Sequence, residues 1–558
     1  MEDRRDTAVL GTAAALCGLP VFADLLLSWR HAPFRYFTSD TYYYLIVARN
    51  AARTGLFSFD GERPTNGFHP LWQALLALLD KGCLLAGVSE LAFCYLVVIL
   101  GACLTMLAVV VIGRTIRRAR GSLPAAFALL PVGLYALLLA PAWIWAQDVR
   151  RNFSTAEGPL PLQGTLWSYV NGMESGLALL AFAIFMAVAT MGPPRTARAA
   201  GLLGLAGAFA VLARLDQVFV AGAVLAVWSV RLGAAEGRAS FGRIVAIGAG
   251  MGAPIAVYLL LNLSYCGVAF PVSGAAKFTF AAAGRSNVAN LAGLLRDGPG
   301  APYWLDRVFR LAQLLIPAAA AAACLAMSVR AVRTPRGPAL ESRRRDELSL
   351  FLAATSAGVL ALCGAVFLFT ETRAYGSWSL PVPVLFVSLA PLGFLAGRQG
   401  GARSTPGLVA CAAASLVVFS ALHRRTDHHE KYRLLYERRG AVAAAYGAKA
   451  PRVVEVDDGI VGFATGFRTL SGFGFAADPE LLAAIRAGRL LPLARARGFD
   501  RVASLVYLPA GAGPESALRF LASACRDDSG AARWTLEYYD PTLPFAIARV
   551  TWPPAAPP

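Results

Sequence analysis

Long apolar runs recur along the whole chain and constrain its fold more than any other feature. Each is close to the length that a helix needs to cross the hydrocarbon core of a bilayer, roughly 20 residues. The 558 residues are 57% hydrophobic and only 15% charged, too few polar side chains for the surface of a soluble protein of this size. We therefore predict a mainly α fold, a polytopic transmembrane helical bundle with about eleven spans. The expected spans are 8–28, 91–113, 123–146, 172–191, 199–214, 217–231, 243–263, 307–329, 348–370, 380–397 and 405–422.

Arginine-rich loops between these runs indicate the orientation of the bundle. Five such loops fall on the side of the N-terminus if the spans alternate, and one short stretch, DVRRN (148–152), falls on the other side. Because short cytoplasmic loops carry an excess of Lys and Arg, we expect the N-terminus in the cytoplasm. Topology thereby accounts for the formal net charge of +18, and no nucleic-acid partner is indicated. The five loops are 113–121, 193–200, 230–243, 329–347 and 397–404.

This orientation gathers the polar segments on one aqueous side, which in a bacterium is the periplasm or the cell exterior. We predict a transmembrane domain over 1–422 and an outer-face α/β domain over 423–558. The predicted outer segments are roughly 29–90, 147–171, 264–306, 371–379 and 423–558. In the C-terminal domain, the runs RVVEV (452–456), RVASLVYL (501–508), WTLEYYD (534–540) and FAIARVTW (545–552) are typical of strands. Helices are expected over 424–447, as a linker, and over 478–498 and 515–524.

The first outer segment contains the most concentrated group of polar candidates. In DTYYYLIVARNAA (40–52), helical spacing places Asp40, Tyr43 and Tyr44 on one face, with the carboxylate near the helix start. Asp40 is either a site residue or part of the cap of an interfacial helix, whose tyrosines would then lie at the level of the headgroups.

The following stretch, DGERPTNGFHPLW (60–72), has the composition of successive turns that lead into a helix. Pro70 is expected in the first helical position, which places His69 beside the helix start. His69 and Asn66 are candidates for binding a phosphate-bearing substrate, and His69 is also a candidate acid or base. The alternative is that His69 only closes the turn.

Ionisable residues also occur at the ends of later spans. Glu174 stands at the outer mouth of one span, where a carboxylate either interacts favourably with the helix dipole or belongs to a site. Arg214 and Asp216 lie between two spans that are joined by almost no loop. Charged residues at membrane depth are costly and are often functional, although an Arg–Asp clamp at the turn is the structural alternative.

Cationic and aromatic residues occupy two further outer segments. FPVSGAAKFTF (270–280) is expected to place Lys277 in a loop, and ETRAYGSW (371–378) adds Arg373 and Tyr375. Each cation alone is equally well explained as solvated or snorkelling. Together these residues would suit a phosphate-bearing lipid and a sugar ring.

Several common signatures are missing from the sequence. There is no GxxxxGK[ST], no GxGxxG after a strand, no HExxH and no GxSxG, which argues against ATP-driven transport, dinucleotide chemistry and common hydrolase mechanisms. The nine cysteines show no spacing typical of a disulfide framework or a metal site.

The motifs together resemble the GT-C membrane glycosyltransferases, a superfamily that includes protein O-mannosyltransferases and aminoarabinose transferases. The likeness spans most of the chain and points to a bacterial subgroup of GT-C type. It is carried by SDTYYYLIVARNAARTG, FDGERPTNGFHPLW, NGMESGLALL, ARLDQ, FPVSGAAK and VVEVDDGIVGFATG.

The resemblance implies a hexosyl- or pentosyltransferase that takes a sugar from a polyprenyl-phosphate donor in the bilayer. It implies transfer to an acceptor hydroxyl of a glycan, lipid or protein on the outer face of the bacterial inner membrane. Asp40 matches the acidic position of the family, with the implied role of general base in an inverting displacement. Lys277 and Arg373 would neutralise the departing lipid phosphate. Many members carry two acids here, whereas TSDTY has one, so we predict no metal cofactor.

Two other classes of protein are compatible with the same features. A transporter or scramblase of lipid-linked sugars would place ionisable residues at mid-bilayer depth and use paired broken helices. A non-catalytic membrane scaffold would use its outer domain to bind partners or glycan.

Overall fold

The structure is a computed structural model that describes most of the chain. The described residues are 2–27, 32–121, 167–280, 287–297, parts of 311–329, 340–369 and 430–551, the last with gaps at 448–449, 457–458, 473, 475, 506–512, 526–531, 541 and 544. Several predictions fall outside them, namely the spans 123–146, 380–397, 405–422 and most of 307–329, and the site residues Arg373 and Tyr375.

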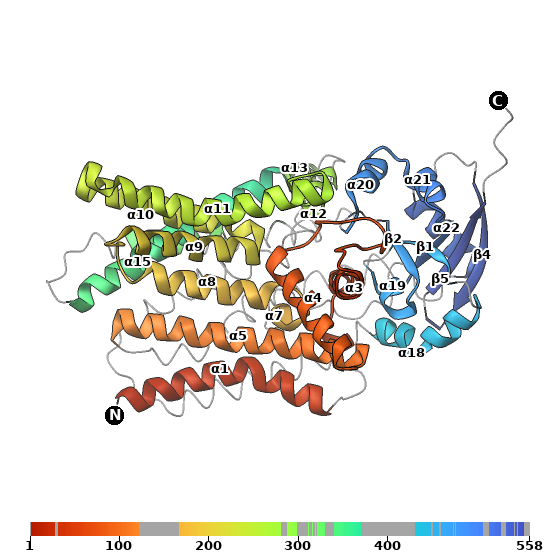
Figure 1. Ribbon diagram of the computed structural model, residues 1–558, viewed down its shortest axis with the longest axis horizontal. Coiled ribbons are helices and arrows are strands. Elements are labelled where there is room, and N and C mark those ends of the chain that lie inside the picture. Colours follow the sequence, from red (N-terminus) through yellow and green to blue (C-terminus); the bar gives the residue numbers. More distant parts are fainter. Residues whose placement is uncertain are drawn as a thin grey trace.

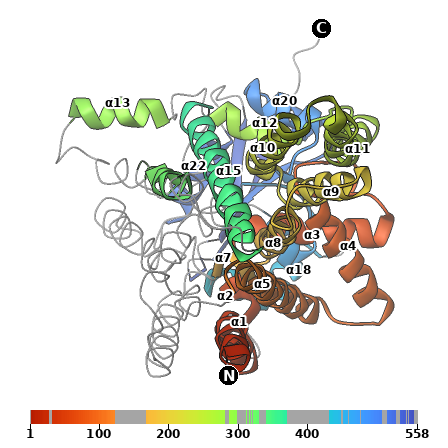
Figure 2. The ribbon, with the colours of Figure 1, turned by 90° about the vertical axis from the view of Figure 1, so that its left-hand side faces the viewer.

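Seven of the described helices lie side by side in an elongated bundle, seen from the side in Figure 1 and from one end in Figure 2. Helix α9 packs against α8, α10 and α11, while α5 packs against α1 and α8, and α15 packs against α10. The seven are α1 (Glu2–Leu27), α5 (Glu90–Arg120), α8 (Ser175–Ala189), α9 (Ala197–Ala213), α10 (Val218–Glu236), α11 (Phe241–Cys266) and α15 (Leu340–Phe369).

The bundle has the length and the composition of a multi-pass membrane protein. Four described segments are long and apolar enough to cross a membrane: Asp6–Leu27, Glu90–Ala119, Leu215–Cys266 and Arg345–Leu368. The third of these contains both α10 and α11, joined by the short turn η3 (Gly237–Ser240). Helices α8 and α9 are apolar but have only 15 and 17 residues. The count of eleven spans stays a prediction.

Some helices extend beyond the expected apolar runs. Helix α1 already begins at Glu2, and α5 continues to Arg120, about seven residues past the predicted end of its run. Charged side chains do not interrupt backbone hydrogen bonding, and here they find partners: the Nε of Arg117 lies 3.3 Å from a carboxylate oxygen of Asp6. Hydropathy identifies only the apolar part of a helix. The helix can continue through polar residues until its backbone hydrogen bonding ends.

Helices α9 and α11 approach each other so closely that glycine is required where they meet. A Cβ atom on Gly204 would lie 2.2 Å from the carbonyl oxygen of Ile247. A Cβ atom on Gly250 would lie 2.3 Å from the carbonyl oxygen of Gly201. Small residues of this kind allow helices to pack tightly in a membrane, where no hydrophobic effect drives helices together.

The two ends of the bundle differ in character. The N-terminus and the described Arg-rich loops lie at one end, where Arg243 donates to the carbonyl oxygen of Pro194 over 3.1 Å (Figure 1). The predicted outer segments that the structure describes lie at the other end. The grouping predicted from the loops is therefore observed, while the side of the membrane that each end faces stays a prediction.

Short helices cover this second end of the bundle. They are α2 (Ala32–Tyr36), α3 (Ser39–Thr54) and α4 (Pro70–Leu85). The start of α3 is fixed by a capping box between Thr38 and Thr41, a reciprocal arrangement that satisfies N–H groups at the helix start. Helix α4 begins with its proline in the first position, as the His-Pro pair predicts.

The C-terminal segment forms a five-stranded mixed sheet with the strand order β2-β1-β3-β5-β4. Strands β2 and β3 are parallel to β1, whereas β5 is antiparallel to both β3 and β4. Four of the strands were expected, but β2 was not, because its residues RTLS lack the consecutive Val, Ile and aromatic residues of the runs that were recognised. The strands are β1 (Arg452–Glu455), β2 (Arg468–Ser471), β3 (Arg501–Ser504), β4 (Arg533–Asp540) and β5 (Phe545–Thr551).

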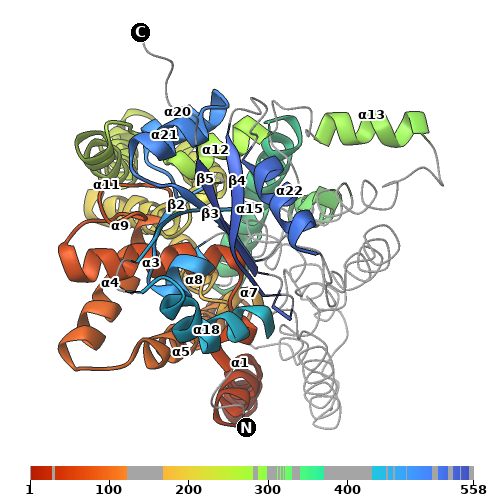
Figure 3. The ribbon, with the colours of Figure 1, turned by 90° about the vertical axis from the view of Figure 1, so that its right-hand side faces the viewer.

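Helices pack around this sheet at the second end of the bundle (Figure 3). The helix expected over 478–498 is two helices, because the chain turns at Gly488, which has a φ of +67°. Helix α19 lies inside the motif VVEVDDGIVGFATG and was not expected. The helices are α18 (Glu430–Ala444), α19 (Ile460–Thr465), α20 (Pro479–Arg486), α21 (Leu490–Ala496) and α22 (Pro514–Ala524).

The C-terminal domain is seated directly on α3 through α19. Gly459, just before α19, has a φ of +102°, and a Cβ atom there would lie 2.8 Å from the backbone nitrogen of Tyr43. From α3, the Arg49 guanidinium donates to the carbonyl oxygen of Gly462 over 3.1 Å and forms an ion pair with Glu90 at 2.6 Å. The helix that begins beside Asp40 is thus held between the bundle and the C-terminal domain.

The close approach of Gly459 to α3 predicts a specific sensitivity to substitution. Gly459→Ala and Gly466→Ala both place an alanine at positive φ, which costs about 1–2 kcal/mol. Only Gly459→Ala also forces a methyl group against the α3 backbone, which adds roughly 1–3 kcal/mol. Gly466 has open space around its Cβ position and is the matched control. Thermal unfolding in detergent should show the larger loss for Gly459→Ala, and equal losses would contradict this seating.

Candidate functional site

Residues that are far apart in the sequence meet where the helices of the bundle end below α3. The loop before α4 contributes His69, the turn before α8 contributes Glu174, and the turn between α9 and α10 contributes Arg214 and Asp216. Helix α3 contributes Tyr44. All five were candidates from the sequence, and hydrogen bonds and ion pairs connect them in one largely buried network.

Glu174 is the centre of this network. Its carboxylate is 1% exposed and directly precedes α8. One oxygen accepts a hydrogen bond from the Nη1 of Arg214 at 2.7 Å and lies 3.4 Å from the Nε2 of His69. The other oxygen accepts from the hydroxyl of Tyr44 at 3.1 Å. A buried carboxylate is stable only when it is paired and hydrogen-bonded, and these contacts meet that requirement.

His69 joins three segments through its backbone and its ring. Its backbone N–H donates to the hydroxyl of Tyr44 at 3.3 Å. Its Nδ1 accepts from the backbone N–H of Leu215 at 3.2 Å, so the ring proton belongs on Nε2, which lies toward Glu174. Both ring nitrogens are thus occupied within the protein. The geometry fits the turn-closing interpretation of this histidine better than an acid or base role.

Arg214 follows the last residue of α9, and its extended backbone, with a φ of −155°, separates this helix from the next. Its Nε donates to both carboxylate oxygens of Asp216, at 3.1 and 3.2 Å, which is the clamp that the sequence suggested. The side chain is buried and shared between the carboxylates of Asp216 and Glu174. Within the described residues its Nη2 has no hydrogen-bond partner, which leaves the two N–H donors of this nitrogen available.

The protonation of the network follows from these contacts. Burial opposes ionisation of Glu174, but its favourable interactions with His69 and Arg214 and the hydrogen bond from Tyr44 hold the pKa of its carboxyl below the ordinary value. Burial, with the charge of Glu174 next to it, raises the pKa of Tyr44 well above its ordinary value. Glu174 is therefore an anion at neutral pH, and Tyr44 remains a hydroxyl that donates to it.

Asp40 lies in the first turn of α3, one helical turn before Tyr44 and on the same face. Its side chain is half-buried, unlike the fully buried Tyr44. The neighbouring Thr41 fixes this turn by donating to the carbonyl oxygen of Asn171 at 2.7 Å. The start of a helix is a favourable place for a carboxylate. Asp40 is thus a water-accessible acid at the edge of the buried network.

Two other predicted residues have structural roles near the network. Tyr43 is 7% exposed and stacks on Tyr44, with 4.6 Å between the ring centroids. Asn66 donates to the carbonyl oxygens of Val268 and Phe270, and accepts from a backbone N–H of the same loop. Asn66 thus connects the first outer segment to the loop after α11 and lies outside the Glu174 network.

The position of Lys277 differs from the prediction that it lies in an outer loop. It lies within the helix α12 (Val272–Phe280) and not in a loop, because the short residues VSGAAK continue helically after Pro271. Its side chain is outside the described part of the structure, as are Arg373 and Tyr375.

The structure also shows supporting residues that sequence reasoning missed. The side chain of Gln73 donates to the carbonyl oxygen of Tyr44 at 3.2 Å, and the ring of Trp72 donates to the carbonyl oxygen of Gly172 at 3.0 Å. Both lie in the first turn of α4 and are fully buried. The Trp and Gln that follow His-Pro-Leu at the start of an apolar run were the signal that could have identified them. They hold α4 against α3 and the turn before α8.

The site offers little to a metal or to a disulfide. Across the part of the chain that the structure describes, no three His, Cys, Asp or Glu side chains come together in a way that could hold a metal ion. The eight cysteines in this part are all free.

Comparisons with known proteins find similarity to solved structures only. No family profile matches the chain, and no curated protein matches it. The crystal structure of ArnT from Cupriavidus metallidurans in the apo state is similar over 94% of this chain and 98% of that one. The sequence identity is 14% and the TM-score is 0.38.

The burial of Glu174 predicts a large effect of neutralising it. Glu174→Gln keeps the shape of the side chain but leaves Arg214 with one carboxylate fewer, and breaking a buried ion pair from one side costs about 3–5 kcal/mol. Glu437→Gln is the control, because it removes an exposed ion pair with Arg433 on α18, worth about 0.5 kcal/mol. Unfolding in detergent should separate the two variants clearly. Similar midpoints would show that the Glu174 pairing contributes little.

Proposed function

We propose that this protein is an integral membrane glycosyltransferase of GT-C type. It would move a sugar from a polyprenyl-phosphate donor to an acceptor hydroxyl on the outer face of the membrane. The observation that carries the proposal is the position of Asp40, a water-accessible carboxylate beside a buried charged network at the end of the bundle. A lipid-linked donor is confined to the bilayer, so the reaction must take place where the spans end and water begins.

Asp40 would act as the general base. Its carboxylate accepts the proton of the acceptor hydroxyl while that oxygen forms a bond to the anomeric carbon of the sugar. The bond between this carbon and the phosphate oxygen breaks, and the polyprenyl phosphate leaves with the electron pair. The displacement inverts the anomeric centre. Proton transfer of this kind usually contributes about 10²–10⁴-fold to the rate.

The leaving phosphate needs positive charge nearby. The candidate cations differ in how much of their charge is already neutralised within the protein. The charge of Arg214 is largely neutralised by Glu174 and Asp216, so this residue offers the phosphate the N–H donors of Nη2 and little net positive charge. The main neutralising cations would then be Lys277 and Arg373, as the resemblance to the GT-C enzymes implies. Preorganised cations at a developing charge are the usual means of stabilising such a transition state.

The Glu174 network would serve this reaction by fixing the positions of the helix ends beneath Asp40. Its hydrogen bonds connect α3 to the ends of three other chain segments, which fixes the helix that carries Asp40. Tyr375 would supply aromatic surface for the sugar ring, whereas Tyr43 is buried against Tyr44 and would support it from within. The donor would enter from the bilayer, and the acceptor from the side of the C-terminal domain.

A transporter or scramblase of lipid-linked sugars is the second candidate, and one observation favours it. Helices α8 and α9 are short and flank a buried charged cluster, which is a pattern found in transporters with broken helices. Purified protein in liposomes distinguishes the two functions. Flipping of a lipid-linked sugar without any transfer to an acceptor would support transport and refute the enzyme.

Asp40→Asn tests the proposed base directly. The amide cannot accept the proton, so sugar transfer should fall by about 10²–10⁴-fold with normal expression and unfolding temperature. Cells with and without the protein are compared first by a glycan profile of the envelope, which identifies the product to be measured.

Asp500→Asn is the matched control, since it changes an exposed carboxylate that pairs with Arg501 in the C-terminal sheet. It should retain full transfer. Near-normal transfer by Asp40→Asn would refute the role of Asp40.

A further inference from the structure

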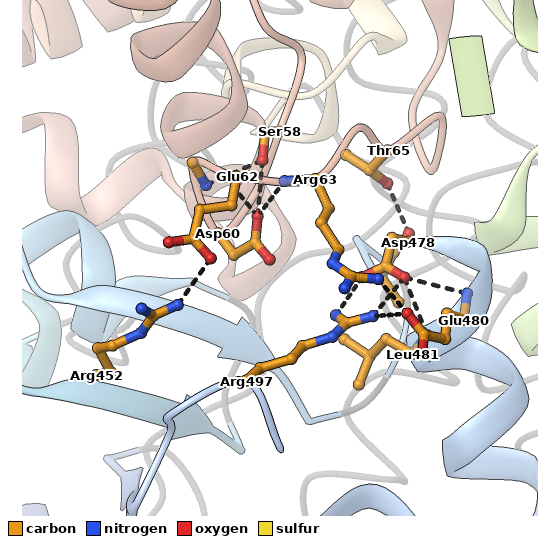
Figure 4. Close-up of polar contacts among 12 residues, drawn as sticks. Ser58, Asp60, Glu62, Arg63, Thr65, Arg452, Asp478, Glu480, Leu481 and Arg497 are labelled. Carbon is orange, nitrogen blue, oxygen red and sulfur yellow. Dashed lines mark hydrogen bonds and ion pairs between the residues drawn. The ribbon is translucent and has the colours of Figure 1, made fainter. Parts of the chain in front are cut away.

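The loop between α3 and α4 connects the C-terminal domain to the Glu174 network. We call residues 57–69 the strap. Its tight turn is built around Asp60, whose Oδ1 accepts hydrogen bonds from the backbone N–H groups of Glu62 and Arg63, both at 2.8 Å. The same oxygen accepts from the hydroxyl of Ser58 at 2.9 Å. This turn presents the side chains of Glu62 and Arg63 to the C-terminal domain (Figure 4).

Glu62 binds two arginines of the sheet. It lies 2.7 Å from the Nη2 of Arg452 on β1, and it also forms an ion pair with Arg468 on β2. All three side chains are partly exposed, from 32% to 44%. An exposed pair contributes little alone and is screened by salt, but one carboxylate between two arginines forms a small network.

Arg63 extends the contact to the start of α20. It forms an ion pair with Glu480, which also lies 2.8 Å from the Nη2 of Arg497. Arg497 is 6% exposed and pairs with Asp478, the residue that caps α20, at 2.6 Å. The strap is thus attached to a rigid part of the C-terminal domain, as Figure 4 shows.

The other half of the strap leads into the site. The hydroxyl of Thr65 donates to the carbonyl oxygen of Ala477 at 2.8 Å, and Asn66 holds the loop after α11. Three residues later, His69 accepts from the N–H of Leu215 and lies against Glu174. Seven residues therefore separate the ion pairs of Glu62 from the imidazole that closes the network.

We propose that Glu62 and Arg63 are positioning residues, which act through the strap to hold His69 on Leu215 and Glu174. The C-terminal domain would then help to position residues of the site. The proposal depends on the proposed function only for its activity readout, because the contact between His69 and Leu215 exists whatever the reaction is.

Hydrogen exchange at the backbone of Leu215 reports this contact without any assay of activity. Glu62→Arg reverses the charge that faces Arg452 and Arg468. We expect exchange in a peptide covering 211–220 to become about five- to tenfold faster, as the loss of about 1 kcal/mol of protection would give. The triple variant Glu62→Arg, Arg452→Glu, Arg468→Glu restores opposite charges and should return exchange to within about twofold of the natural protein.

Glu437→Arg is the matched control, because it breaks an exposed ion pair with Arg433 on α18 that does not touch the strap. It should leave exchange at Leu215 unchanged. Unchanged exchange in Glu62→Arg, or equal acceleration in Glu437→Arg, would overturn the proposal. Glu62, Arg468 and Glu437 are at the surface, whereas the guanidinium of Arg452 lies 4.6 Å from the ring centroid of Phe499, so the unfolding midpoint of the triple variant is measured before its exchange is compared.

Transfer kinetics supply the second readout. Glu62→Arg should lower kcat by a similar factor with little change in KM, and the triple variant should recover it. If no variant and no natural protein transfers sugar, the proposed function fails while the exchange result still decides the role of the strap. Faster exchange at Leu215 with unchanged kcat would show that His69 does not need this position, and would overturn the positioning role.

Discussion

The need to pair a buried carboxylate governs the arrangement of this end of the molecule. Glu174 is almost wholly removed from water at the start of α8, where an unpaired charge would cost several kcal/mol. Arg214, Tyr44 and His69 each supply a hydrogen-bond donor to it, from three separate segments. These contacts therefore fix three segments relative to one another: the turn between α9 and α10, the start of α4 and the helix α3.

This arrangement fixes the helix that carries Asp40, the proposed general base. The helix that carries it is held from below by Tyr44 and Thr41, and from the other side by Gly459 and Arg49 at the C-terminal domain. A base must be fixed in position yet reachable by substrate. The first turn of α3 meets both conditions, because its backbone is anchored while its carboxylate remains half-exposed.

Much of the architecture was predictable from local patterns. Hydropathy located the seven helices of the bundle because membrane-spanning segments must be apolar along their length. His-Pro predicted the start of α4, and the positions of Arg214 and Asp216 predicted their ion pair. The strand β2, the helix α19 and the helical placement of Lys277 were missed, since these short segments contain glycines or few β-branched and aromatic residues and so carry no clear local signal.

The sequence by itself determined that the chain is a multi-pass helical protein with polar residues gathered at one end. It also named Tyr44, His69, Glu174, Arg214 and Asp216 as candidates, each with an equally good local explanation. Only the tertiary structure decided that these five form one network, that both nitrogens of His69 are occupied, and that the strap joins the C-terminal domain to them. The physical reason is that hydrogen bonds and ion pairs between distant segments depend on how helices pack, which no local pattern encodes.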